Sequence, residues 1–182
     1  ALSGKSFGDQ YIDHFIQNDS DLLNSTIIKS MNKVIVQEKD FDLTMEVALA
    51  RGNDSDIGAV VSFVGTVRDL DNESINKMTL EHYPGMTEKA LNSIVEQAQL
   101  RWPLGNTTVI HRVGELSIND QIVLVITTSK HRKAAFEACE FIMDYLKTQA
   151  PFWKKEHTTT ESKWVEAKDS DLQQSDKWRS QN

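Results

Sequence analysis

Cysteine is the scarcest reactive residue in this chain of 182 residues, because it occurs once, as Cys139. One thiol excludes an intrachain disulfide and a zinc site made of four cysteines. This usage fits a reducing compartment. Because Cys139 lies between Ala138 and Glu140 in an apolar helical pattern, we interpret it as a packed and unreactive side chain.

Long apolar stretches are also missing from the sequence. The longest, at about residues 59–64, is far shorter than the roughly 20 apolar residues that a membrane helix needs. Residues 1–20 contain early acidic residues and no sustained apolar segment, so we expect no signal peptide. The default expectation is therefore a cytoplasmic protein without a membrane partner.

Positive charge is in deficit over the chain as a whole, with a formal net charge of −7. This balance argues against a general partner of nucleic acid or of anionic membranes. The charge is uneven, because residues 130–157 contain six Lys and Arg residues against four Asp and Glu residues. We expect this basic region to attract a small anionic substrate. No spacing of His, Cys and carboxylate residues resembles a metal site, so we predict neither a metal nor a cofactor.

The periodicity of the apolar residues predicts an α+β domain. Strands are expected over residues 33–37, 58–67, 77–83, 107–113, 121–128 and 162–167, and helices over residues 43–51, 84–101 and 129–148. We expect the second and third strands to pair as a hairpin, and Asp42 and Ser129 to cap the helices that follow them. Hairpins and separated helices favour an antiparallel β-sheet with packed helices over a doubly wound parallel sheet.

Composition divides the chain into three parts. Residues 1–30 form an N-terminal extension of unknown role, residues 31–171 form the domain, and residues 172–182 form a polar tail. With 39% hydrophobic residues, the chain is long enough to bury a substantial core.

Residues 141–156, FIMDYLKTQAPFWKKE, carry the most informative functional signal. Lys147 ends an amphipathic run, and two bulky aromatic residues separate it from Lys154 and Lys155. Apolar walls and neighbouring cations disfavour the charged form of an amine, which suits a lysine to nucleophilic catalysis or to anion binding. The plainer alternative is a helix C-terminus whose cations complement the helix dipole.

Two further basic sites show the same ambiguity. Arg68 stands where the strand over residues 58–67 meets a loop, well placed to bind a phosphate or carboxylate, although an ion pair with Asp69 or Asp71 is the alternative. Residues 130–133 (KHRK) open the last helix, where free N–H groups favour an anion. A solvated basic turn is the alternative there.

The distance along one helix separates these candidates. Lys147 follows His131 by sixteen residues, which places the two about 24 Å apart on nearly opposite sides of a helix. They therefore cannot share a small-molecule site within one subunit. Either they serve different sites, or an antiparallel pairing of two copies brings them together. We interpret His82 and His111 as structural hydrogen-bonding residues, although Arg112 beside the latter could face a ligand.

Five segments together resemble one family, the large, catalytic subunits of molybdopterin synthase. They are GAVVSFVGTVRD (58–69), LEHYPGMTEKAL (80–91), RWPLGNTTVIHRVGEL (101–116), SKHRKAAFEA (129–138) and FIMDYLKTQAPFWKKE (141–156). The likeness runs in order from about residue 33 to residue 171, so the predicted domain is a molybdopterin synthase large-subunit-like domain.

The resemblance implies a fold, partners and a reaction. The fold is an α/β-hammerhead with antiparallel sheet, and two large subunits form a central homodimer. Each end of that dimer binds a small ubiquitin-like sulfur-carrier subunit, whose C-terminal Gly-Gly tail ends in a thiocarboxylate, to give a heterotetramer. The enzyme is a sulfurtransferase that adds two sulfurs to cyclic pyranopterin monophosphate, forming the dithiolene of molybdopterin.

The resemblance also assigns site residues. Lys147 and Lys154 correspond to the catalytic pair, and the substrate pocket is lined by Thr66, Val67, Arg68, Lys154, Lys155 and Glu156. His131 and Arg132 match residues donated by the second large subunit, in agreement with the helix-length argument. Thr66 stands where lysine is expected and Lys168 where arginine is often found, so contacts with the substrate phosphate differ from the family pattern.

Two other functions remain open at this level. A non-catalytic scaffold could bind the ubiquitin-like carrier without chemistry, although the intact set of basic residues argues against it. A sensor of a phosphorylated ligand would bind its ligand without any carrier.

Overall fold

The computed structural model describes residues 31–68, 75–158, 162–165 and 177–178. Expectations for residues 1–30, Asp69, Asp71 and Lys168 fall outside this part. Its strands are β1 (Asn32–Gln37), β2 (Ala59–Thr66), β3 (Ile75–His82), β4 (Leu104–Arg112), β5 (Gly114–Ser117), β6 (Gln121–Ser129), β7 (Phe152–Thr158) and β8 (Ser162–Val165), and its helices are α2 (Leu43–Arg51), α3 (Met86–Arg101) and α4 (Arg132–Gln149).

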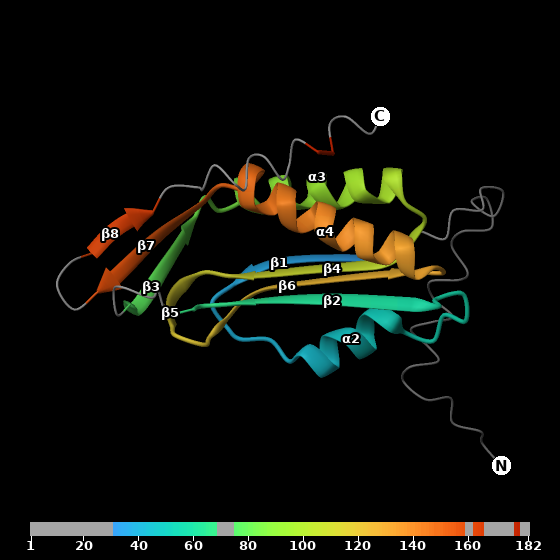
Figure 1. Ribbon diagram of the computed structural model, residues 1–182, viewed down its shortest axis with the longest axis horizontal. Coiled ribbons are helices and arrows are strands. Elements are labelled where there is room, and N and C mark those ends of the chain that lie inside the picture. Colours follow the sequence, from blue (N-terminus) through green and yellow to red (C-terminus); the bar gives the residue numbers. More distant parts are fainter. Residues whose placement is uncertain (1–30, 69–74, 159–161, 166–176, 179–182) are drawn as a thin grey trace, which may run out of the picture.

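The strands form two sheets. The first has the order β1-β4-β6-β2, in which β1 and β4 are parallel and the other neighbours are antiparallel. Helices α3 and α4 cover one of its faces and α2 covers the other (Figure 1). The second sheet has the order β5-β3-β7-β8, is antiparallel throughout, and lies beyond one end of the first (Figure 1). The predicted α+β class is confirmed, with one parallel pair.

Burial explains why these segments form these elements. Seven consecutive residues of β6, from Val123 to Ser129, are buried, as expected for a strand with helices on both faces. The predicted inner face of α4 is confirmed, because Ala135, Ala138, Ile142, Tyr145 and Leu146 are all buried. Cys139 is also buried, as interpreted.

Of the two predicted helix caps, one is confirmed and the other is wrong. Asp42 caps α2, since its side chain accepts a hydrogen bond of 2.8 Å from the backbone N–H of Met45. Ser129 does not cap α4, whose N-cap is His131. Ser129 instead ends β6, and its hydroxyl donates to the carbonyl of Pro103 at 2.8 Å. The strand therefore continues further than its apolar pattern indicated.

Two predictions about strands are wrong. β3 does not pair with β2 as a hairpin, because β2 pairs with β6 and β3 joins the second sheet between β5 and β7. In addition, residues 152–158 form β7, where the sequence predicts no strand. Charged residues on both faces of this strand hid its alternation.

Candidate active site

The seam between the two sheets is closed by a small apolar cluster. Val67, directly after β2, packs with Met78 and Leu80 of β3 and with Leu116 of β5. Its backbone N–H donates to the carbonyl of Asp120 at 2.9 Å, and its carbonyl accepts from the N–H of Asn119. Val67 thus fixes the end of β2 against the second sheet, and its neighbours Thr66 and Arg68 are exposed beside it.

Lys154 and Glu156 lie on the face of the second sheet that this cluster occupies. The register pairs Lys154 with Leu80 and Glu156 with Met78, and directly paired residues of an antiparallel sheet share a face. The Lys154 Nζ lies 2.7 Å from Glu156 Oε1. The Glu156 side chain is only 14% exposed and the lysine 36%, so the pair is partly withdrawn from water. This places Val67, at the end of β2, on the same face of the second sheet as Lys154 and Glu156.

Lys155 points the other way. It pairs with Thr79 and Trp164, and its Nζ lies over the Trp164 ring at 5.4 Å from the centroid. Since side chains alternate along a strand, Lys155 is on the face opposite to Lys154 and Glu156. The structure therefore does not group the three residues on one face.

The two ends of α4 carry the remaining predicted residues. Lys147 is exposed in the last turn, next to the start of β7, whereas His131 and Arg132 are exposed at the first turn. A helix of 18 residues is roughly 27 Å long, so one chain does not bring these ends together. Figure 1 shows the helix crossing the first sheet, with its C-terminal end toward the second sheet and its N-terminal end at the far side.

His111 joins the two sheets from within. Its ring stacks on Phe152 of β7, with centroids 3.8 Å apart and planes inclined by 18°. The pKa of His111 is lowered to about 4, mainly by burial, which outweighs the opposing hydrogen bond with the carbonyl of Arg112, and to a smaller extent by nearby His82. The histidine is therefore neutral near pH 7 and has the predicted structural role.

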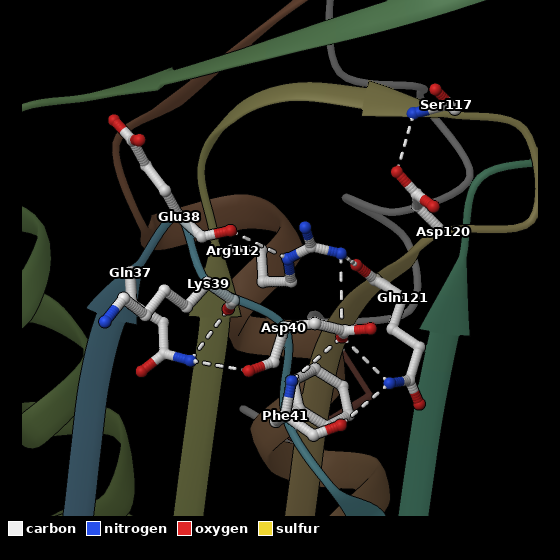
Figure 2. Close-up of polar contacts among 9 residues, drawn as sticks. All are labelled: Gln37, Glu38, Lys39, Asp40, Phe41, Arg112, Ser117, Asp120 and Gln121. Carbon is white, nitrogen blue, oxygen red and sulfur yellow. Dashed lines mark hydrogen bonds and ion pairs between the residues drawn. The ribbon is translucent and has the colours of Figure 1, made fainter.

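Arg112 is also structural. Its Nε donates to the carbonyl of Glu38 at 3.1 Å and its guanidinium donates to the carbonyl of Gln121 at 2.9 Å (Figure 2). Asp40 lies 3.6 Å from the same guanidinium and accepts from the Gln121 amide. These bonds tie the segment between β1 and α2 to the ends of β4 and β6, so the alternative in which Arg112 faces a ligand is not what the geometry shows.

Among the described residues, no three His, Cys, Asp or Glu side chains are grouped as a metal site would require. In the same part of the chain, no helix has the length and apolar character to cross a membrane.

A family model described as MoaE protein matches residues 36–149, more than half of the chain. The chain belongs to the MoaE family. Its curated relatives include the molybdopterin synthase catalytic subunits of Vibrio cholerae, 56% identical over 149 residues (81% of this chain and 98% of the relative), and of Escherichia coli, 54% identical over 147 residues (80% and 97%).

Solved structures of similar proteins have the same fold. Molybdopterin cofactor biosynthesis protein E of Burkholderia multivorans is 52% identical with a TM-score of 0.70, covering 82% of this chain and 97% of that one. Molybdopterin synthase from Staphylococcus aureus is 32% identical with a TM-score of 0.67, covering 72% and 95%. The predicted family is confirmed, and this MoaE chain is an enzyme subunit of molybdenum cofactor biosynthesis.

Proposed function

We propose that the chain catalyses sulfur transfer from the C-terminal thiocarboxylate of a small ubiquitin-like subunit to cyclic pyranopterin monophosphate, giving the dithiolene of molybdopterin. Its likeness to molybdopterin synthase catalytic subunits over about four-fifths of its length carries this proposal. The partly buried pair of Lys154 and Glu156 at the seam between the sheets supplies chemistry that such a reaction needs.

The reaction uses a sulfur nucleophile and positive charge. The thiocarboxylate sulfur attacks an oxygen-bearing side-chain carbon of the pterin, and the carbon–oxygen bond breaks so that the oxygen leaves as water or with the phosphate. The carrier is then attached to that carbon through a thioester. Water then cleaves the acyl–sulfur bond, so the sulfur stays on the pterin and the carrier leaves with a carboxylate. Lys147 and Lys154 stabilise the oxyanion that forms during this cleavage. Glu156 holds the amine of Lys154 in place through their 2.7 Å contact.

The phosphate of the substrate needs its own cations. Arg68 follows Val67 at the end of β2 and can bind a phosphate with its planar guanidinium. His131 and Arg132 complete the site in this proposal, but from a second copy, because His131 lies sixteen residues before Lys147, about 24 Å away along α4. The functional unit is then a homodimer with two shared sites, each with its own carrier subunit.

The direct test is to mix the chain with a thiocarboxylated carrier and the cyclic pterin and to follow the dithiolene product by mass spectrometry. A carrier ending in an ordinary carboxylate is the control. We expect Lys147→Ala to abolish turnover while the far-UV circular dichroism spectrum stays unchanged. Carrier binding without product in the unmodified protein would favour the scaffold function instead.

A mixed dimer tests the shared site. His131→Ala and Lys147→Ala are each expected to be inactive alone. A mixed dimer has one site with both residues intact, so random exchange of subunits should restore about a quarter of the unmodified turnover. If mixing restores nothing although exchange is demonstrated, the two residues do not act in one site.

A further inference from the structure

Trp178 is a buried residue that contacts elements distant from it in the sequence. It is 4% exposed and belongs to the main core cluster. Its ring meets Trp102 and Phe141 edge to face, with centroids 5.6 Å apart in both cases. Aromatic pairs in this geometry add to the stabilisation that burial alone gives. Phe141 also contacts Tyr145, at 4.5 Å, so the ring of Trp178 is built into the C-terminal half of α4.

Polar contacts fix the same dipeptide on two helices. The indole N–H of Trp178 donates to Asp144 Oδ2 at 2.8 Å, and its carbonyl accepts from Arg101 at 3.0 Å. Lys177 Nζ lies 2.6 Å from Glu140 Oε1 and 3.2 Å from Asp144 Oδ2. Hydrogen bonds to charged groups are stronger than neutral ones. Lys177 and Trp178, here termed the C-terminal anchor, therefore bind the end of α3 and the last turns of α4.

The anchored turn directly precedes the proposed catalytic lysine. Asp144 comes three residues before Lys147, within one helical turn. The helix ends at Gln149, and β7 with Lys154 begins at Phe152 after a connection that contains Pro151. A shift of the last turn would therefore move Lys147 and the start of β7 together, although the anchor touches neither Lys147 nor Lys154 in any described contact.

We propose that Lys177 and Trp178 are positioning residues that hold the C-terminal turn of α4, and with it Lys147, in the geometry for sulfur transfer. This inference rests on the proposed function. A displacement of about 1 Å at a reacting group can cost up to roughly 100-fold in rate. Trp178→Ala should therefore lower kcat by roughly 10- to 100-fold, with a much smaller change in KM for either substrate.

A graded series separates the contacts. Trp178→Phe keeps an aromatic ring but loses the hydrogen bond to Asp144, so its loss in kcat should be intermediate. Lys177→Met should lower kcat less than Trp178→Ala, and Lys89→Met, at an exposed lysine of α3, serves as its matched control. In the charge-swapped variant Glu140→Lys/Lys177→Glu the ion pair reforms, so its kcat should exceed that of Lys177→Glu alone.

A merely stabilising role must be told apart from positioning. Ile110→Ala removes a buried side chain on the opposite face of the first sheet and provides a variant of lowered stability with the anchor intact. Below both unfolding midpoints, Ile110→Ala should keep its kcat while Trp178→Ala does not. A second readout is the acylation rate of the Lys147 amine, measured by mass spectrometry, which should change in Trp178→Ala and stay constant in Ile110→Ala.

The outcomes are distinct. If the unmodified protein does not transfer sulfur, the proposed function fails. If it does, and Trp178→Ala keeps its kcat and the acylation rate of Lys147, the anchor has no positioning role. Equal losses of kcat in Trp178→Ala and Ile110→Ala would also overturn the inference, because stability alone would then explain them.

Discussion

The first and second sheets differ in what their faces meet. Both faces of the first sheet are covered by helices, and its central strand β6 is buried over Val123–Ser129. The second sheet has an apolar cluster at one part of its inner face, with the Lys154–Glu156 pair beside it, and exposed Trp153 and Trp164 on its outer face. The first sheet therefore supplies most of the buried apolar surface, and the second sheet supplies the partly buried Lys154–Glu156 pair.

Helix α4 connects these two roles. Its inner face packs on the first sheet, with contacts to β6 and β2, while its last turn leads into β7 of the second sheet. A rigid, buried support for a site on a more exposed element is what catalysis requires, because the reacting groups must keep their geometry. Variants that damage one sheet should thus show which property each sheet controls.

The largest expected effect is a loss of stability caused by a substitution in the first sheet. Leu124 of β6 is fully buried between β2 and β4, so Leu124→Ala should lower the free energy of unfolding by about 2–5 kcal/mol through lost transfer energy and a cavity. Urea unfolding followed by circular dichroism measures it. Below the midpoint, kcat should stay within about twofold of the unmodified value, since no site group moves. A loss of kcat with little loss of stability would contradict the division between the sheets.

The second prediction concerns the second sheet, where we expect a large loss of kcat and a smaller loss of stability. Lys154→Met should lower kcat by roughly 100- to 1,000-fold, because the oxyanion loses a cation in a partly buried position. The cost to stability should be smaller than that of Leu124→Ala, about 1–3 kcal/mol for the carboxylate of Glu156 left without its partner. Lys77→Met is the matched control, since Lys77 forms an exposed ion pair with Glu115 in the same sheet. Equal activity in both variants would remove Lys154 from the mechanism.

The difference between the sheets also explains what could be predicted from the sequence. Strand β6 of the first sheet and the inner face of α4, which packs on that sheet, were predicted because burial imposes an apolar periodicity on the sequence. β7 was missed, because Lys154, Lys155 and Glu156 place charge on both of its faces and no apolar alternation remains. Partners of strands were also missed, since the move of β3 to a second sheet depends on contacts distant in sequence.

Some residues of the candidate site could likewise be predicted from the sequence, whereas others could not. Lys147, Lys154 and Arg68 could be singled out from basic residues set beside apolar ones, and from the resemblance to a family. That Lys155 faces away from Lys154 follows only from the strand over residues 152–158. The C-terminal anchor gave no signal, because a lone tryptophan in a polar tail has no periodicity and its contacts lie about 34 to 77 residues away along the chain.

A third prediction concerns the junction of the sheets at pH values below 7. Burial lowers the pKa of His111 from 6.5 to about 4, so the unfolded chain binds a proton that the folded chain excludes. Stability must then fall as the pH drops from 6.5 to 4, by up to about 3 kcal/mol from this residue. His111→Gln should flatten this dependence, as measured by urea unfolding at several pH values. Identical slopes in both proteins would show that His111 is not the group responsible.

The smallest expected effect lies on the face of the first sheet away from the site. Asp42 accepts a hydrogen bond from the N–H of Met45 at the start of α2, so Asp42→Ala should cost about 1 kcal/mol of stability. Asp42→Asn keeps a side-chain acceptor and should cost less. Neither change should alter kcat, because α2 packs against β2, β4 and β6 on the face of the first sheet opposite α4. A clear loss of kcat in Asp42→Ala would mean that a strain on that face reaches the seam through the first sheet, and the separation of support from chemistry would then be incomplete.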